Sequence, residues 1–166
     1  MSMGKNIKQE LEYEARATRK YLERMPAEQF GWQPHAKSMS LGLLASHVAE
    51  LPEWTGVLIN QDEFVLDMEN YQPWIASGPQ ELVEKFDACL KDACRLLEEV
   101  DDARMLAIWR MKVGEQIVLE LPRIAVVRSM ILSHLIHHRG QLSVYLRLLD
   151  IPVPATYGPS ADEQND

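Results

Sequence analysis

The sequence contains no apolar run of the roughly 18–20 residues that a membrane-spanning helix requires. Its first residues lack the apolar segment of a secretory signal, so we expect a cytoplasmic protein with no membrane partner. Positive charge is also scarce, because 17 lysines and arginines stand against 25 aspartates and glutamates, for a net charge of −8. The basic residues are scattered and form no patch for a phosphate backbone, so we expect no nucleic-acid partner either.

Cysteine is rare in this chain, which contains only Cys89 and Cys94. Five residues apart on a helix, their side chains would point about 140° apart, which opposes a local disulfide and shared binding of one ion. No histidine adjoins either residue to lower the pKa of its thiol. We interpret both cysteines as reduced, buried apolar residues and not as nucleophiles.

Apolar residues recur at helical spacing in four segments, and prolines separate these segments. The predicted helices cover residues 7–25, 40–59, 79–100 and 123–149. Pro26 ends the first helix, whereas Pro79 and Pro122 stand at helix starts, where proline is tolerated. Ser40 is suited to cap the second helix, and Pro52 inside that helix predicts a kink.

The segments between these helices differ from one another in character. Residues 61–78 form a long connection between the second and third helices, and the tail at 153–166 is rich in proline, glycine and acidic residues. The apolar spacing changes around a Gly-Glu turn, which predicts a short extended excursion at residues 106–119, before the fourth helix. The sequence therefore predicts one all-α domain over residues 1–166, an antiparallel four-helix bundle.

The histidines carry the clearest chemical signal. His134 and His138 are four residues apart on the apolar stripe of the last predicted helix, so their imidazoles can converge on one ion. His47 lies on the apolar face of the second predicted helix, and facing helices supply the further ligands of metal sites in bundle cores. Neutral imidazoles suit borderline-soft divalent ions, so the pattern predicts a site for Zn²⁺ or Ni²⁺.

An alternative interpretation of these histidines needs no metal. Buried imidazoles can form a structural network of hydrogen bonds with carbonyl or carboxylate groups. The pair at His134 and His138 also lacks the glutamate that marks a zincin motif. Of the remaining histidines, we expect His35 in a surface loop and His137 as a packing neighbour of the site and not a ligand.

Three segments of the sequence resemble the DinB family of four-helix-bundle metalloenzymes. They are residues 38–50, residues 134–147 with the motif His-His-Arg-Gly-Gln, and the ending at 152–163. The resemblance implies that His47, His134 and His138 hold one metal ion, with water or another ligand completing its shell. It also implies a possible homodimer, since members are often dimeric, and several relatives are thiol transferases or isomerases that use a low-molecular-weight thiol.

Together these observations predict a metal-dependent enzyme that acts on a small molecule by thiol transfer or hydrolysis. Three protein ligands leave an open position on the ion, as in catalytic zinc sites. The candidate residues for the pocket or for catalysis are Gln141, Tyr145, Trp54 and Glu50, the last as a general base. The alternative function is a non-catalytic, metal-stabilised binding or stress-related protein, in which the ion joins two helices.

Overall fold

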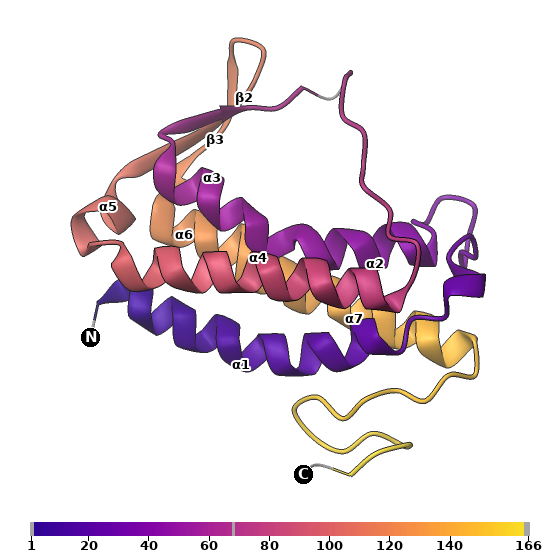
Figure 1. The fold of residues 1–166 in the computed structure, drawn as a ribbon. Helices are drawn as coiled ribbons and strands as arrows, with labels where there is room; N and C mark the ends of the chain where they lie inside the picture. The colour runs from indigo at the N-terminus through magenta and orange to yellow at the C-terminus, as the bar shows by residue number, and fades with distance from the viewer. Residues whose placement is uncertain (1, 68, 165–166) are drawn as a thin grey trace.

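The computed structural model describes residues 2–67 and 69–164, and long helices pack side by side in it around an apolar core (Figure 1). The helices are α1 (Met3–Glu23), α2 (Leu41–Glu50), α3 (Trp54–Asn60), α4 (Pro79–Glu99), α5 (Asp102–Leu106), α6 (Arg123–Val127) and α7 (His134–Leu148). Helix α4 packs against α1 and α2, and α2 also packs against α7. Almost fully buried side chains from these helices fill the core, among them Leu11, Leu22, Leu44, Phe86 and Leu146.

Local sequence sets several of the helix ends. The Ser40 hydroxyl accepts a hydrogen bond from the backbone N–H of Leu43 at 3.3 Å and so caps the start of α2. The Asp101 carboxylate caps α5 in the same way, through the N–H of Arg104 at 2.6 Å. Pro79 begins α4, where the missing N–H of proline costs no helical hydrogen bond.

Two of the predicted helices are interrupted. The second is divided by the 3₁₀ turn η2 (Leu51–Glu53), which contains Pro52, and continues as α3. The last contains the π-helical stretch η3 (Arg128–Ser133) between α6 and α7. Because a π-helical turn contains more residues than an α-helical turn, η3 rotates the side chains of α7 about the helix axis. This rotation helps to set the face on which His134 and His138 lie.

The expectation of an all-α four-helix bundle is wrong, because a three-stranded mixed sheet lies above one end of the helices in Figure 1. Its strands are β1 (Glu63–Val65), β2 (Ile108–Val113) and β3 (Gln116–Pro122), in the order β1-β2-β3. Strands β2 and β3 form an antiparallel hairpin, and Gly114 in its turn has a φ of +55°, which glycine adopts easily. Strand β1 pairs in parallel with β2 and sets Phe64 opposite Met111.

A buried arginine fastens the sheet to the helices. Arg123, the first residue of α6, is fully buried. Its Nε and Nη2 atoms donate to the carbonyls of Leu58 at 2.9 Å and Gln61 at 2.8 Å. The same guanidinium pairs with Asp62 and donates to the carbonyl of Ile108 at 3.2 Å. It therefore connects the end of α3, the start of β2 and the start of the last helical run.

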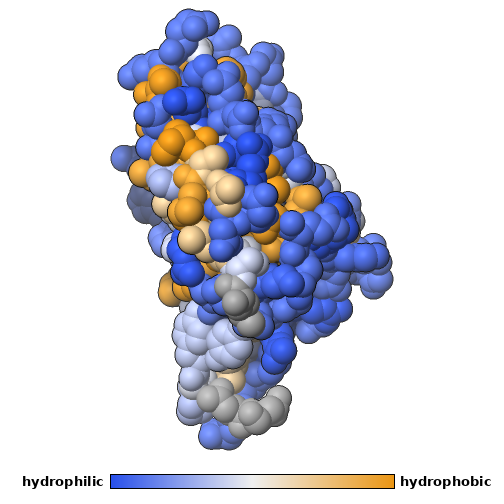
Figure 2. Space-filling view, turned by 90° about the vertical axis from the view of Figure 1, so that its left-hand side faces the viewer, coloured by the Kyte–Doolittle hydropathy of each residue, from blue (hydrophilic) through white to orange (hydrophobic). Residues whose placement is uncertain are grey.

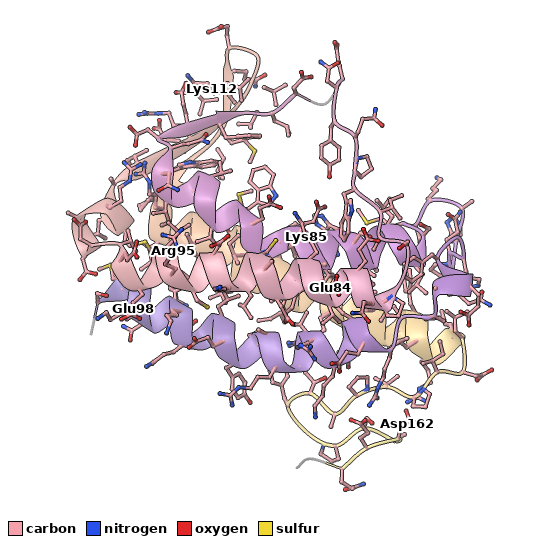
Figure 3. The ribbon with its side chains drawn as sticks, in the orientation of Figure 1. Glu84, Lys85, Arg95, Glu98, Lys112 and Asp162 are labelled. Carbon is pink, nitrogen blue, oxygen red and sulfur yellow. The ribbon has the colours of Figure 1, made fainter. Side chains whose placement is uncertain are left out.

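Hydrogen bonds attach the tail after α7 to the bundle. Asp162 accepts from the backbone N–H of Val153 at 2.8 Å and from Arg147 of α7 at 2.6 Å (Figure 3). Glu163 pairs with Arg24, which follows α1. The tail therefore spans the ends of two helices, and the last two residues of the predicted tail, 165 and 166, lie outside the described residues.

Arg139 of α7 forms a second link between the tail and the bundle. Its side chain is 3% exposed and pairs at 2.7 Å with the Glu14 carboxylate of α1, which is 12% exposed. Arg139 also donates to the hydroxyl of Tyr157 at 2.7 Å, and that hydroxyl donates to Glu14 at 2.7 Å. One buried ion pair therefore joins α1, α7 and the tail.

Apolar side chains also reach the surface of the sheet. The face on the left-hand side of Figure 1 is mostly hydrophilic, but apolar residues gather on its upper part (Figure 2). Exposed apolar residues of α5 and the strands are Val65, Leu106, Ile108, Val113, Ile117, Val118 and Leu121. None of the helices in the described part of the chain combines the length and apolar character needed to cross a membrane.

Candidate metal centre

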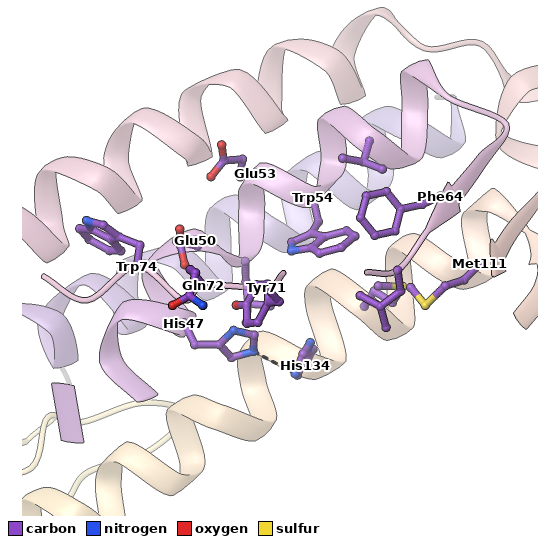
Figure 4. A pocket seen from close by; sticks show the side chains of 14 residues that line it. His47, Glu50, Glu53, Trp54, Phe64, Tyr71, Gln72, Trp74, Met111 and His134 are labelled. Carbon is purple, nitrogen blue, oxygen red and sulfur yellow. Dashed lines mark hydrogen bonds between the residues drawn. The ribbon is translucent and has the colours of Figure 1, made fainter. Parts of the chain in front are cut away.

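Three imidazole rings meet between α2 and α7. His47 lies in the last turn of α2, and His134 and His138 lie in the first turns of α7. The Nε2 atom of His134 is 3.3 Å from Nε2 of His47 (Figure 4). It is also 2.7 Å from Nε2 of His138. The structure therefore brings together the three side chains that the helical spacing pointed to.

The contact with Gln141 indicates where the ring proton of His138 lies. Nδ1 of His138 lies 2.6 Å from Oε1 of Gln141, and because an amide oxygen only accepts, this Nδ1 carries the proton. In a neutral imidazole protonated on Nδ1, the Nε2 atom is an acceptor. The Nε2 atom of His138 therefore has a free lone pair, and it lies 2.7 Å from Nε2 of His134.

This arrangement fits a cation. Ring nitrogens bound at about 2.0–2.1 Å to a tetrahedral ion lie roughly 3.3 Å from one another. The separation of 3.3 Å matches that value, the separation of 2.7 Å is shorter, and the donor atoms of all three histidines lie within 4.8 Å of one another. The hydrogen bond from His138 to Gln141 also resembles the second partner that metal-bound histidines usually have. The triad can therefore hold one metal ion.

Burial keeps these rings neutral. Burial first, and then the nearby His138 and His134 rings, lower the pKa of His47 to about 4. Burial also lowers the pKa of His134 and the pKa of His138, although the hydrogen bond with Gln141 opposes the shift at His138. A neutral imidazole has the free lone pair that a cation requires, so little proton release accompanies binding near neutral pH.

A cavity of about 590 Å³ opens beside the histidines (Figure 4). His47 and His134 belong to its wall, and most of the remaining wall is apolar. Four aromatic side chains contribute to it: Trp54, Phe64, Tyr71 and Trp74. An ion held by the triad would therefore adjoin a space of the size that small-molecule sites commonly have.

Known proteins with the same sequence pattern identify the family. A family model described as the DinB family matches residues 1–166. The chain belongs to the DinB family. The resemblance seen in the sequence is therefore confirmed over the whole chain. A search of curated proteins gave no match.

Two solved structures of DinB-like proteins have a similar fold. One, from Bacillus subtilis, is 16% identical with a TM-score of 0.69, and the match covers 96% of this chain and 99% of that chain. The other, from Bacillus cereus, is 20% identical with a TM-score of 0.67, and the match covers 90% of this chain and 94% of that chain. At these identities the likeness shows that the DinB fold is shared.

In this DinB protein, three of the candidate residues lie at the site. Gln141 contacts His138, as described above, and Glu50 and Trp54 belong to the cavity wall. His137 is exposed, and its ring centroid lies 4.9 Å from that of His138. It is a neighbour of the triad and not a member of it.

Tyr145 and His35 lie elsewhere. The Tyr145 hydroxyl donates to the carbonyl of Met39 at 3.1 Å, and its ring meets Trp32 edge-on with centroids 5.5 Å apart. Tyr145 does not belong to the cavity wall and instead joins α7 to the segment before α2. His35 is exposed, and its Nδ1 accepts from the backbone N–H of Lys37 at 3.1 Å.

Sequence reasoning did not identify much of the DinB cavity wall. The unidentified residues come from β1, β2, the connection to α4 and η3, and they include Phe64, Met111, Tyr71, Trp74 and Met130. The available signal was the length of the connection at 61–78, because long loops in compact domains are usually functional or disordered. Its aromatic residues complete the wall opposite the helices (Figure 4).

Proposed function

We propose that this DinB protein is a metal-dependent enzyme that acts on a small molecule, by thiol transfer or by hydrolysis. The observation that carries the proposal is the cluster of His47, His134 and His138, whose ring nitrogens lie within 4.8 Å of one another beside a cavity of about 590 Å³. Three neutral imidazoles that converge in this way can share one cation, and the cavity can hold a substrate next to it. The proposal includes a cytoplasmic location and a homodimer, which rest on the sequence and the family resemblance alone.

His47, His134 and His138 would hold the ion, and Zn²⁺ or Ni²⁺ best suits three neutral imidazoles. When bound, such an ion lowers the pKa of a water or a thiol and so supplies a nucleophile near neutral pH. The part of the protein is to orient the ligands and to exclude water. Gln141 orients the His138 ring, and the aromatic wall excludes bulk water from the reacting atoms.

The chain's own thiols are poorly suited to be the nucleophile. Burial raises the pKa of Cys89 to about 11, and burial also raises the pKa of Cys94. Neither cysteine belongs to the cavity wall. Thiol transfer at this site would therefore use a low-molecular-weight thiol from solution, bound in the cavity as a second substrate.

Metal content and turnover, measured on the same preparation, test the proposal. We expect untagged protein to contain one ion per chain. We also expect it to catalyse one of two reactions: transfer of a low-molecular-weight thiol to a chromogenic electrophile, or hydrolysis of a chromogenic ester. Chelation, and separately the His134→Ala variant, should remove the ion and the turnover together. Undiminished turnover by a metal-free His134→Ala protein would exclude this function.

A second candidate function is suggested by the placement of the ligands on two helices. An ion bound by His47 of α2 and by His138 of α7 would join these helices and stabilise the fold by linkage. In that case chelation would lower the melting temperature markedly, and neither the thiol nor the ester substrates would react. Turnover that depends on the ion separates the enzyme from this alternative.

A further inference from the structure

The charged groups on the cavity wall are carboxylates. Within the described residues, the wall contains Glu50 and Glu53 and no lysine or arginine. Glu53 is already neutralised, because it pairs at 2.8 Å with Lys85 of α4, whose ammonium lies 6.0 Å from the centroid of the Trp74 ring. Glu50, by contrast, makes no hydrogen bond and no ion pair with any residue that the structure describes.

The unpaired carboxylate of Glu50 is partly buried. Glu50 ends α2, about one helical turn after His47, and its carboxyl is not among the donor groups that cluster with the histidines. Burial raises the pKa of Glu50, and the nearby Lys85 opposes this shift. A partly buried charge without a partner is unfavourable. Lys85 offsets only part of the effect of burial, so a cation from solution beside Glu50 would offset more of it.

Aromatic rings share the cavity with this carboxylate. Figure 4 shows Glu50 in the same part of the wall as Trp74 and Tyr71. Trp54, four residues after Glu50, meets Phe64 edge-to-face with centroids 5.0 Å apart. The faces of such rings attract ammonium groups that lie within about 6 Å of the ring centroid. Carboxylate and rings together therefore favour a positively charged, partly apolar ligand over an anionic one.

We infer that the cavity binds a small molecule with a primary ammonium group on an apolar body, and that Glu50 pairs with the ammonium. This inference rests on the proposed function in that it names the substrate class of the same site. It gives Glu50 a binding role in place of the general-base role expected from the sequence. The apolar body would lie against Trp54 and Phe64, and the end of the molecule away from Glu50 would reach the histidines.

Calorimetric titration with three matched probes tests this inference. The probes are phenethylamine, the neutral 2-phenylethanol and the anionic 3-phenylpropionate, each added to metal-free and to metal-loaded protein. In the metal-free protein we expect phenethylamine to bind at least about tenfold more tightly than either analogue, as one charge-assisted hydrogen bond would produce. The Glu50→Gln variant should lose this preference, whereas Glu10→Gln, the same charge change on the exposed surface of α1, should keep it.

Several outcomes would overturn the inference. Equal affinity for the amine and the alcohol would do so, as would an amine preference that survives in a folded Glu50→Gln protein. A Glu50→Gln protein that keeps its amine affinity but loses turnover of uncharged substrates would instead make Glu50 a general base. Amine binding is measured in metal-free protein, whereas the metal-dependent reaction is tested by metal content and turnover. A failure of this inference can therefore be distinguished from a failure of the proposed function.

Discussion

The Nδ1 atom of His138 donates a hydrogen bond to the side-chain oxygen of Gln141 across 2.6 Å. The two residues are three apart on α7, so the helix itself places the amide beside the ring. This bond fixes the proton on Nδ1 and leaves the lone pair of Nε2 directed at His134. Gln141, an exposed residue, therefore helps to orient a buried imidazole of the triad.

We predict that Gln141→Ala lowers the affinity for Zn²⁺ by about 10–100-fold, because the His138 ring loses the partner that holds it in place. Competition with a chromogenic chelator measures this affinity. Gln80→Ala is a suitable control, since Gln80 is an exposed residue of α4 that bonds to Glu84 at 2.7 Å (Figure 3). Unchanged affinity in Gln141→Ala would show that the ring needs no such support.

Substitution of the adjacent residues His137 and His138 should have very different effects on metal content. We predict that His138→Ala lowers bound metal far below one ion per chain, because two imidazoles remain of the three. His137→Ala should retain the full ion content, because that side chain is exposed and lies outside the triad. Elemental analysis of both purified proteins makes the comparison, and equal metal loss in the two would contradict the assignment of ligands.

Removing the buried arginine of α7 should destabilise the fold strongly. We predict that Arg139→Ala lowers the free energy of unfolding by about 3–5 kcal/mol, because it leaves the Glu14 carboxylate buried without its partner. Urea denaturation provides the measurement. Arg128→Ala breaks the exposed pair with Glu10, whose side chains are 49% and 46% exposed, and should cost less than about 1 kcal/mol. Similar losses in the two variants would argue against the buried link.

The attachment of the tail should weaken in acid. The hydrogen bond from Arg147, and then that from the Val153 backbone, lower the pKa of Asp162. A carboxyl whose pKa is lower in the folded state stabilises the fold above its unfolded pKa and loses this effect as the pH falls through the folded pKa. Asp162→Asn should therefore be less stable than the wild type at about pH 7 and nearly equal to it at about pH 2. A difference in unfolding free energy that does not change with pH would refute this.

Sequence periodicity predicted the long helices but not the sheet. Pro79 and the apolar spacing after it mark α4, because a helix of that length repeats its pattern several times. Strand β1 has three residues, too few for a period of two to be visible, and its partner β2 lies far along the chain. The excursion before the last helix was expected, but nothing local indicated that β1 would join it in a mixed sheet.

The site was predictable to the extent that it depends on helical spacing. His134 and His138 share a face of one helix, so their convergence follows from the sequence, and His47 was the remaining core-facing histidine. The π-helical stretch η3 was not predicted, because the apolar spacing of the last helix does not mark it. The role of Tyr145 as a link to Met39 was missed for a similar reason, since only the fold brings those residues together.

The cavity wall combines residues of the helices that carry the histidine triad with residues of a separate loop. His47 and His134 belong to α2 and α7, whereas Tyr71, Gln72 and Trp74 come from the connection before α4. Substitutions in that connection can change the shape of the cavity without altering any of the three histidines. The loop and the triad can therefore vary independently of each other in this fold.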